Sequence, residues 1–313
     1  MYTAMAKRKS EYVVDSAYFT VARLLVSEVV DVLKSKGGLN VAQYRLLLEL
    51  YDLIGDNKRV SELAERLGMQ PNVVTQTANE LEKFGLVRRI VDEQDGRARF
   101  IEITALGVAR VELVDKVVNE GIYSVFGCLD EDYARLLKEA ILTLGASIAG
   151  TEVEQEDTLA ISSQYLTALF TVEQIAVDAV KNNTDLAYND ARIMLLLHEV
   201  GHPMRSKDIA RYLFLKPNNV SRAADRLVEK GYVQRLSDPE NAQAVIIGAT
   251  ERGVEVHNQL AELRDTLANP IVFGCLDKEH AEVMNNVAQI VIDRLWDESD
   301  KAARVDSTGN TIR

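Results

Sequence analysis

The chain has 313 residues, of which 47% are apolar and 27% charged, the balance of a soluble globular protein. This composition excludes a disordered chain and a disulfide scaffold, and the length suffices for two ordinary domains. The sequence has no apolar run of about 18 residues, which excludes a membrane span. Two cysteines and the lack of a visible signal peptide predict a cytoplasmic protein. The net charge of −12 argues only weakly against nucleic acid, because DNA responds to the local charge that faces it.

The chain contains an internal repeat, the feature to look for first in any sequence. When the sequence is shifted by 146 residues, residues 60–89 fall on residues 206–235, and ten of these 30 positions are identical. The segment VFGCLD also occurs twice, at residues 125–130 and 272–277. Two repeats of about this length indicate duplicated domains rather than solenoid units, whose periods are roughly 20–50 residues.

An acidic stretch separates the two repeats. Residues 151–157 read TEVEQED and form the predicted linker. We therefore expect one repeat over residues 1–150, a second over residues 158–300 and a polar C-terminal tail over residues 301–313. The two repeats should follow the same order of elements.

Repeat one shows helical periodicity at both ends and two extended, β-branched segments in between. Ser61 is the expected N-cap of a short helix, and Pro71 stands in the first turn of the next. Asp95-Gly96 predicts the turn of a hairpin. The expected helices cover residues 11–36, 41–54, 60–67, 71–84, 104–125 and 130–149, and the expected strands cover residues 86–91 and 98–103.

Repeat two follows the same order, four helices, a hairpin and two further helices. Its expected helices cover residues 159–181, 189–199, 206–213, 217–229, 250–267 and 277–296, and its hairpin covers residues 232–249. Two short helices and a tight turn followed by a β-hairpin define a winged helix-turn-helix, whose second helix enters the DNA major groove. The predicted fold class is therefore mainly α with small β-hairpins, in two tandem winged helix-turn-helix domains.

One stretch of each repeat contains the helix-turn-helix and the wing. In repeat one it is SELAERLGMQPNVVTQTANELEKFGLVRRIVDEQDGRARFIEITALG, whose DEQDGR wing is followed by IT and a glycine. This pattern resembles the wing signature of the MarR family of bacterial transcription regulators. In repeat two the stretch is KDIARYLFLKPNNVSRAADRLVEKGYVQRLSDPENAQAVIIGATERG, with a decayed wing. Family members are usually homodimers joined through their first and last helices. The resemblance thus implies helical dimerisation regions and a monomeric pseudo-dimer, similar in arrangement to tandem Sar-type regulators, with a true homodimer as the alternative.

The resemblance also implies which side chains face DNA. Arg97 takes the place of the wing arginine of the family, and Arg99 is an additional wing candidate. Asn72 and Asn218 near the helix starts would contact phosphates or, alternatively, cap the turns. The chemistry fits, because Arg reads guanine bidentately, Gln reads adenine, and Ser or Thr bonds bases or phosphates. The candidates are Asn72, Thr75, Gln76, Arg97, Arg99, Lys216, Asn218, Ser221, Arg222 and Arg226.

The two repeats differ in how they would hold DNA. Repeat one has a complete wing, but its recognition helix carries Gln76 and Glu80. Repeat two has a cationic recognition helix, but Asn241 and Gln243 stand where the wing would need Asp and Arg. We therefore expect the operator to be an imperfect palindrome. The wing of repeat one should bind one half-site, and mainly the recognition helix of repeat two should bind the other.

MarR-like proteins commonly bind small aromatic acids or amphipathic compounds between the dimerisation helices and the DNA-binding lobe. The resemblance therefore implies an effector of this kind. Aromatic residues at helical spacing are more often core than pocket, and that alternative stays open. The candidates are Tyr12, Tyr18, Arg23, Tyr44 and Tyr51 in repeat one and Tyr165 and Tyr188 in repeat two.

The segment HEVGH, from His198 to His202, matches the H-E-x-x-H pattern of zinc peptidases. That chemistry needs both histidines on one face of a continuous helix, and the neighbouring glycine and proline predict that the helix ends there. A shift of 146 residues also places the two histidines on Asp52 and Asp56. We expect no enzyme activity and no cofactor, and keep His198 and His202 only as candidates for a sensing metal ion.

Cys128 and Cys275 occupy equivalent places in the repeated FGCLD segment. The simpler interpretation is that both are small, half-buried residues at a turn between helices. The alternative is a thiol sensor, which the sequence supports poorly because no nearby residue is plainly cationic enough to lower the thiol pKa.

Together these features predict a cytoplasmic transcription regulator that binds double-stranded DNA and has no membrane partner. The resemblance favours a repressor that a small-molecule effector releases from its operator. The alternative is a ligand-sensing interaction protein in which one or both DNA-binding heads are vestigial.

Overall fold

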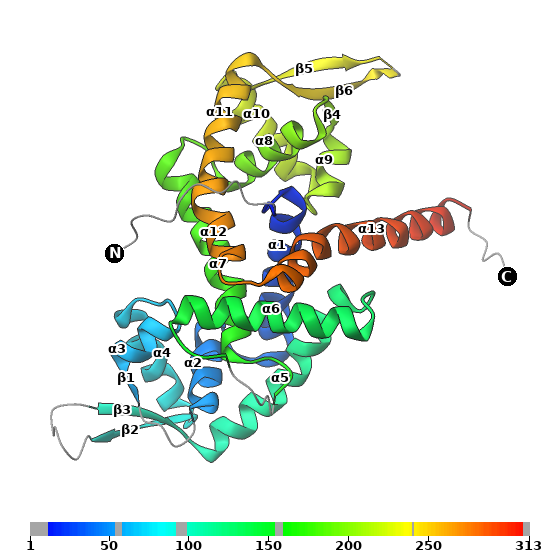
Figure 1. Cartoon of the computed structure of the whole chain (residues 1–313). Helices are drawn as coiled ribbons and strands as arrows, with labels where there is room; N and C mark the ends of the chain where they lie inside the picture. Colours follow the sequence, from blue (N-terminus) through cyan, green and yellow to red (C-terminus); the bar gives the residue numbers. More distant parts are fainter. Residues whose placement is uncertain (1–11, 54–57, 92–98, 154–158, 240, 309–313) are drawn as a thin grey trace. The chain divides into compact units, whose positions relative to one another are not determined.

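The structure, a computed structural model, describes residues 12–53, 58–91, 99–153, 159–239 and 241–308 (Figure 1). The chain forms two compact units, and each combines parts of both repeats. Unit 1 consists of residues 1–23 and 172–313, and unit 2 consists of residues 24–171. The first helix of each repeat, α1 (Ser16–Val32) or α7 (Ser163–Asn183), begins in one unit and ends in the other. Each unit therefore holds the winged helix of one repeat and the start of the first helix of the other.

Unit 2 carries the elements of repeat one. Its helix-turn-helix consists of α3 (Val60–Arg66) and α4 (Pro71–Lys83), and its wing consists of β2 (Val87–Val91) and β3 (Arg99–Ile103). The third strand, β1, pairs with β3, so the sheet is antiparallel with the order β1-β3-β2. After α1 the elements are η1 (Leu33–Gly37), α2 (Val41–Asp52), β1 (Lys58–Arg59), α3 (Val60–Arg66), α4 (Pro71–Lys83), β2 (Val87–Val91), β3 (Arg99–Ile103), α5 (Ala105–Phe126) and α6 (Glu131–Ala149).

Unit 1 carries the same elements from repeat two, again with a three-stranded antiparallel sheet, here in the order β4-β6-β5. Its helix-turn-helix consists of α9 (Ser206–Tyr212) and α10 (Pro217–Glu229), and its wing consists of β5 (Val233–Asp238) and β6 (Asn241–Ala249). After α7 the elements are α8 (Tyr188–Val200), β4 (Met204–Arg205), α9 (Ser206–Tyr212), α10 (Pro217–Glu229), β5 (Val233–Asp238), β6 (Asn241–Ala249), α11 (Glu251–Leu263), η2 (Arg264–Ala268), α12 (Asn269–Phe273) and α13 (Lys278–Thr308).

The same hydrogen bonds recur in both units and fix the entry to the helix after the wing. Thr104 accepts a hydrogen bond from Gly107 N at 3.1 Å and donates to Gly85 O at 2.7 Å. Thr250 does the same with Gly253 N at 3.0 Å and Gly231 O at 2.7 Å. An N-cap threonine that also donates to the turn after the recognition helix joins this turn to the helix that follows the wing. This confirms the predicted helix starts at Thr104 and Thr250.

A buried arginine in each unit connects the helix-turn-helix of one repeat to the start of the first helix of the other repeat. Arg45 of α2 donates to Leu67 O at 2.6 Å, and its NH2 group lies 3.4 Å from Thr167 Oγ1. Arg192 of α8 donates to Leu213 O at 2.9 Å and to Thr20 Oγ1 at 3.1 Å. Burial lowers the pKa of Arg45 to about 10, so it stays charged at neutral pH. Each guanidinium therefore holds the carbonyl that ends the first helix of the helix-turn-helix.

Several predicted boundaries need correction. Ser61 is not an N-cap, because α3 already begins at Val60, and the Glu62 carboxylate accepts from Arg59 N at 2.7 Å. The short strands β1 and β4 were not predicted, since two residues carry no periodicity. The predicted linker and the turn at Asp95-Gly96 fall wholly or partly outside the described residues. The expected polar tail is, up to Thr308, a continuation of α13.

The predicted helix over residues 250–267 is interrupted. It ends at Leu263 and continues as the π-helical turn η2, whereas its counterpart α5 is an unbroken α-helix. The repeats are offset by 146 residues at Gly107 and Gly253 but by 147 at Asp130 and Asp277. A π-turn has the wider i→i+5 spacing and accommodates one extra residue, so η2 takes up this insertion.

Candidate functional site

The second helix of each helix-turn-helix has one buried and one exposed polar face. In α4, residues at positions i, i+3, i+4 and i+7 point into the core, and those between them are exposed apart from the half-buried Glu80. The equivalent face of α10 is exposed in the same way, and both helices begin at a proline, which has no N–H to leave unpaired. The exposed predicted residues are Asn72, Thr75 and Gln76 on α4 and Asn218, Ser221, Arg222 and Arg226 on α10, with Lys216 at the N-cap of α10.

On α4, the carboxylate of Glu80 accepts hydrogen bonds from two amide side chains. Gln76 Nε2 donates to Glu80 Oε1 at 3.3 Å, and Gln43 Nε2 from α2 donates to Glu80 Oε2 at 3.0 Å. Thr75 uses its hydroxyl within the helix, where it donates to Pro71 O at 2.9 Å. The reading face of α4 therefore presents amides and a carboxylate rather than a cation.

On α10, one predicted reader is engaged by the protein itself. Arg226 donates two hydrogen bonds to Asp190 of α8, with Nε 2.9 Å from Oδ2. The Asp190 side chain is 1% exposed and that of Arg226 44%. Arg222, one turn earlier, is exposed and makes no hydrogen bond or ion pair with another described residue. The structure thus separates Arg222, which is free to bind, from Arg226, which ties α10 to α8.

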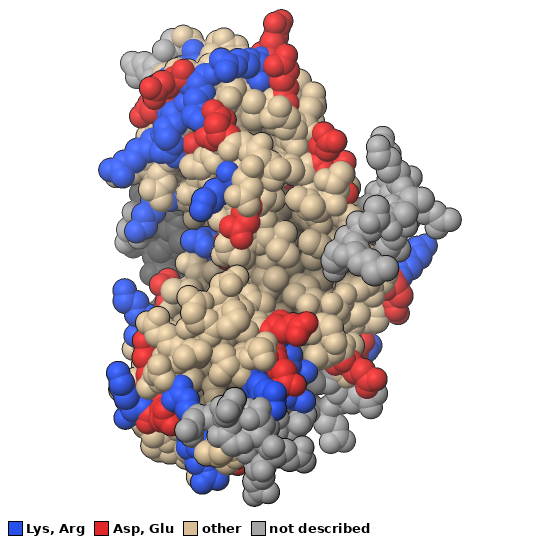
Figure 2. All heavy atoms as spheres, turned by 90° about the vertical axis from the view of Figure 1, so that its left-hand side faces the viewer, with Lys and Arg blue, Asp and Glu red and all other residues tan. Residues whose placement is uncertain are grey.

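Basic side chains gather at the end of unit 1 that carries the helix-turn-helix, in the upper part of Figure 2, with acidic side chains among them. Some of these cations are paired. Arg235 NH2 lies 2.5 Å from Asp225 Oδ1, and Lys230 Nζ lies 2.7 Å from Asp185 Oδ2. Lys207, Lys216 and Arg222 are exposed, and no other described residue forms an ion pair with them. The local charge at this end of unit 1 is therefore more positive than the net charge of the chain suggests.

The wings are described only in part. Arg97 lies outside the described residues, and so do the side chains of Arg99, Asn241 and Gln243. In unit 1 the buried Asp238, next to a β-bulge, forms an ion pair with Arg205 at the start of α9. This pair joins the wing to the first helix of the helix-turn-helix.

The turn between the two helices differs between the units. In unit 2 it contains Gly68 at φ +60°, and the N–H of the next residue, Met69, bonds Ala64 O at 2.9 Å. In unit 1 the same place is taken by Phe214 at φ +48°, with the matching bond from Leu215 N to Ala210 O at 2.9 Å. A left-handed conformation suits glycine but strains a residue with a Cβ.

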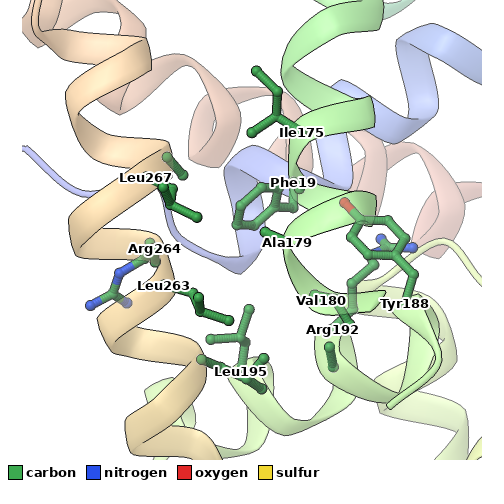
Figure 3. A pocket seen from close by; sticks show the side chains of 14 residues that line it. Phe19, Ile175, Ala179, Val180, Tyr188, Arg192, Leu195, Leu263, Arg264 and Leu267 are labelled. Atoms are coloured by element: carbon green, nitrogen blue, oxygen red, sulfur yellow. The ribbon is translucent and has the colours of Figure 1, made fainter. Parts of the chain in front are cut away.

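An apolar pocket lies within unit 1, between α7, α8 and the α11–η2 segment (Figure 3). Leu263 and Leu267 face Ile175 and Ala179 across it, and Phe19 from the start of α1 projects between them. Its cavity volume is about 40 Å³. This space holds a few water molecules, so a larger guest requires the surrounding side chains to move apart.

Polar groups reach this pocket from α8. Tyr188 and Arg192 line it, and burial is the main cause that raises the pKa of Tyr188 to about 12. Arg192 is 3% exposed, and its Nε is buried without a hydrogen-bond partner among the described residues. Arg264 also belongs to the lining, but Figure 3 shows its guanidinium directed away from the hollow. The pocket is thus apolar with one buried guanidinium in its wall.

The other predicted effector residues lie elsewhere. Tyr44 and Tyr165 belong to the buried core of unit 2. Arg23 pairs with Glu173 at 2.5 Å, and the Tyr12 ring lies beside that of Phe273, tilted by 37°, with ring centroids 5.6 Å apart. Tyr18 and Tyr51 are half-buried, and neither is among the residues that line the described pocket. Tyr188 is the predicted residue that this pocket contains.

The histidines of the H-E-x-x-H segment are separated. Helix α8 ends at Val200 with Gly201 at φ +71°, which confirms the predicted helix end. His198 stacks on His257 of α11, with ring centroids 3.1 Å apart, while His202 lies beyond the helix with Nδ1 3.0 Å from Pro203 O. Within the described residues, no group of three or more His, Cys, Asp or Glu is placed to hold a metal ion.

Equivalent capping bonds correct the expected alignment of these histidines. Ser163 N donates to Asp52 Oδ2 at 2.9 Å, and Ser16 N donates to Glu199 Oε1 at 3.1 Å. Both pairs differ by 147 residues, so Asp52 corresponds to Glu199 and not to His198. The shift of 146 holds only after the short loop that follows α2 and α8.

Sequence reasoning missed Phe19, Arg192 and Arg264 as pocket residues. Arg192 carries a visible signal, since an arginine inside a run of buried apolar residues must find partners within the protein. The same signal stands at Arg45 in YRLLLEL. The two cysteines, Cys128 and Cys275, are half-buried, and neither forms a disulfide bond. None of the described helices is both long and apolar enough to cross a bilayer.

Both units therefore contain a winged helix-turn-helix, a class of fold built to present one helix and one hairpin on a surface. Comparison with family models gives the more particular identification. The model of the MarR family matches residues 37–98 and residues 184–244, one region in each repeat. These two regions of the chain, one after the other, therefore have the winged helix-turn-helix fold of the MarR family.

Several solved structures are similar to parts of the chain, and no curated protein matches it. CouR from Rhodococcus jostii RHA1, bound to p-coumaroyl-CoA, is 24% identical, with 43% of this chain and 90% of that chain covered and a TM-score of 0.36. Sco3205 from Streptomyces coelicolor, in complex with DNA, is 21% identical, with 42% and 86% covered and a TM-score of 0.39. MarR from E. coli in its apo form is 16% identical, with 39% and 88% covered and a TM-score of 0.34.

Proposed function

We propose that this protein is a transcription regulator that binds double-stranded DNA with both of its winged helices, as an intramolecular pseudo-dimer. The observation that carries the proposal is the exposed polar face of α4 and of α10, at equivalent places in two MarR-type regions. A helix with this face enters the major groove, where Asn, Gln, Ser, Thr and Arg side chains bond base edges and phosphates. The proposal includes no catalytic step and no cofactor.

The acidic net charge is compatible with this function, because binding depends on the charges near the phosphates. Lys207, Lys216 and Arg222 supply such charges in unit 1. A protein that neutralises phosphates loses affinity as salt rises, with a log–log slope of about −0.9 for each neutralised phosphate. The alternative, an interaction protein with vestigial heads, would show no such slope.

The test is selection of genomic fragments by the purified full chain, followed by titration of the selected duplex at several salt concentrations. We expect enrichment of an imperfect palindrome and a steep fall of affinity with salt. The charge-reversing variant Arg222→Glu should bind the selected duplex at least ten-fold more weakly, while Lys116→Glu, which changes an exposed lysine of α5 outside the proposed face, serves as the matched control. Absence of any enriched sequence would contradict the proposal.

The proposal extends to a repressor that a small amphipathic or aromatic acid releases. The pocket of unit 1 supports this part, because its lining is apolar and Arg192 offers an unpartnered Nε to an acid group. The same guanidinium binds Leu213 O, which ends α9, and Thr20 from the start of α1. An acid that draws Arg192 toward the pocket weakens both bonds and shifts the population of recognition-helix positions.

Aromatic carboxylates of increasing size provide the test of the effector. We expect some of them to raise the melting temperature of the full chain and to lower its affinity for the selected duplex. Ala179→Leu, which fills the pocket, should abolish both effects, whereas Ala109→Leu on the exposed face of α5 should leave them unchanged. Equal responses of the two variants would contradict the assignment of this pocket.

A further inference from the structure

We propose that the two recognition helices read different bases at their equivalent reading positions, adenine through Gln76 in unit 2 and guanine through Arg222 in unit 1. The two residues correspond under the 146-residue shift, each five residues after the proline that opens its helix. The inference rests on the proposed DNA-binding function and adds to it the identity of the bases and the residues that choose them.

In unit 2, Glu80 fixes the orientation of the Gln76 amide. Glu80 accepts from Gln76 Nε2 at 3.3 Å and from Gln43 Nε2 at 3.0 Å. Because a carboxylate only accepts, the NH2 group of Gln76 must face Glu80, and its carbonyl oxygen must face away. One N–H and the carbonyl oxygen of Gln76 remain for another partner. These two groups are the donor and acceptor that pair with N7 and N6 of adenine.

Glu80 also acts against guanine. The major-groove edge of guanine carries two acceptors, O6 and N7, whereas adenine offers an N6 amino donor beside its N7. A carboxylate next to the reading position repels an edge made of acceptors and tolerates one that carries an amino group. Unit 2 therefore combines an attraction toward adenine with a repulsion of guanine, the two means by which an interface gains specificity.

In unit 1, the equivalent reading residue is a free guanidinium. Asp225, three residues further along α10, and Asp190 of α8 are both engaged by other arginines. Asp225 binds Arg235 at 2.5 Å, and Asp190 is bound by Arg226 through two hydrogen bonds. Arg222 is thus left exposed and without an ion-pair partner among the described residues. A guanidinium in this state matches the two acceptors of guanine bidentately.

The residue one turn after the reading position is Glu80 in unit 2 and Arg226 in unit 1. In both units it binds the helix that precedes the helix-turn-helix. Glu80 binds Gln43 of α2, and Arg226 binds Asp190 of α8, the residue equivalent to Gln43 under the 147-residue shift. The polarity of this pair is reversed between the repeats, but it joins the same two helices. Arg226 is therefore a positioning residue that holds α10 in place, and not a reader of bases.

The test uses the full chain and a duplex library in which both halves of the selected operator are randomised. We expect an A·T preference at one position of one half-site and a G·C preference at the equivalent position of the other. Gln76→Arg, made together with Glu80→Gln to remove the opposing carboxylate, should convert the first preference to G·C, and Arg222→Gln should convert the second to A·T. Each change should alter the discrimination roughly 5- to 150-fold, the range of one bidentate base contact.

Arg226→Met is the matched control, because it removes a guanidinium from the same helix. It should weaken binding of all sequences alike and leave the preferred bases unchanged. If the wild-type chain selects the same base pair in both half-sites, or if the double variant Gln76→Arg with Glu80→Gln and the variant Arg222→Gln weaken all sequences equally, the assignment of readers is overturned while DNA binding stands. If no duplex is selected at all, the proposed function fails and this inference fails with it.

Discussion

At the scale of single residues, the recognition helix of unit 1 contains two arginines, Arg222 and Arg226. Both lie on the exposed face of the helix, but their surroundings differ. Sequence reasoning places Arg222 and Arg226 together, because both fall on the exposed face of an amphipathic helix. It cannot distinguish them, because the partner of Arg226, Asp190, is 36 residues away in another helix. The surroundings of the two side chains, rather than the periodicity, decide which one can bind a ligand.

This difference predicts different effects on stability. Arg226→Met leaves the carboxylate of Asp190 buried and unpaired, and we expect it to lower the unfolding free energy of unit 1 by about 1–3 kcal/mol, less than a fully buried pair because Arg226 is partly exposed. Arg222→Met should change it by less than about 0.5 kcal/mol. Hydrogen exchange of the α8 and α10 amides measures both. Equal protection in the two variants would show that the ion pair does not hold the helix.

The stacked pair of His198 and His257 predicts a pH dependence. Burial is the main cause that lowers the pKa of His257 to about 4, with the nearby His198 and Arg264 acting in the same direction. The unfolded chain therefore takes up this proton first, near pH 6.5. The contribution of His257 to the stability of unit 1 should be constant above about pH 6.5 and fall by about 1–3 kcal/mol as the pH drops toward 4.

The repeat supplies the control for this experiment. Val111 stands at the place of His257 in repeat one, so His257→Val is a substitution that the fold accepts elsewhere. Asp15 and Glu199, whose pKa values are raised by burial, are present in both proteins, and their effects cancel in the difference. The stability difference between wild type and variant should change between pH 6.5 and 4. A difference independent of pH would refute the assignment.

At the scale of elements, the turn of the helix-turn-helix predicts a stabilising substitution. Phe214 holds a left-handed backbone conformation that Gly68 holds in unit 2. Since a Cβ in this conformation costs about 1–2 kcal/mol, Phe214→Gly should raise the unfolding free energy of unit 1 by about 1 kcal/mol. Gly68→Ala should lower that of unit 2 by a similar amount. Thermal unfolding of both variants measures these two changes. If Phe214→Gly lowers the stability, the contacts of the Phe214 side chain stabilise unit 1 by more than its left-handed backbone destabilises it.

The sequence predicts the elements better than it predicts their interruptions. The helix starts at Pro71, Thr104, Asp130 and Pro217 are local signals, and the structure confirms them, because capping depends on a few neighbouring residues. The π-turn η2 has no local signal, since it follows from one inserted residue that packing forces into the helix. The pocket beside it depends on α7, α8 and Phe19, three segments far apart in the sequence, and periodicity gives no information about such a meeting.

At the scale of the whole molecule, the start of α1 lies in the unit of the other repeat. This predicts which winged helix loses stability when the N-terminus is truncated. The start of α1 contributes Thr20 to Arg192 and Ser16 N to Glu199, all within unit 1. A chain that begins at Leu24 should therefore lose stability in the winged helix of repeat two while that of repeat one stays protected. Hydrogen exchange resolved by element measures this. Loss of protection confined to α2 and α4 would contradict the assignment of these residues to unit 1.

The central claim is that both winged helices of one chain bind DNA. The most direct measurement is hydroxyl-radical footprinting of the full chain on its selected duplex, with Arg222→Glu and Gln76→Glu as probes of the two heads. We predict two protected stretches whose centres lie about one helical turn, or a small multiple of it, apart, and each variant should remove the protection of one stretch only. A single protected stretch, or loss of both stretches in each variant alike, would contradict the account.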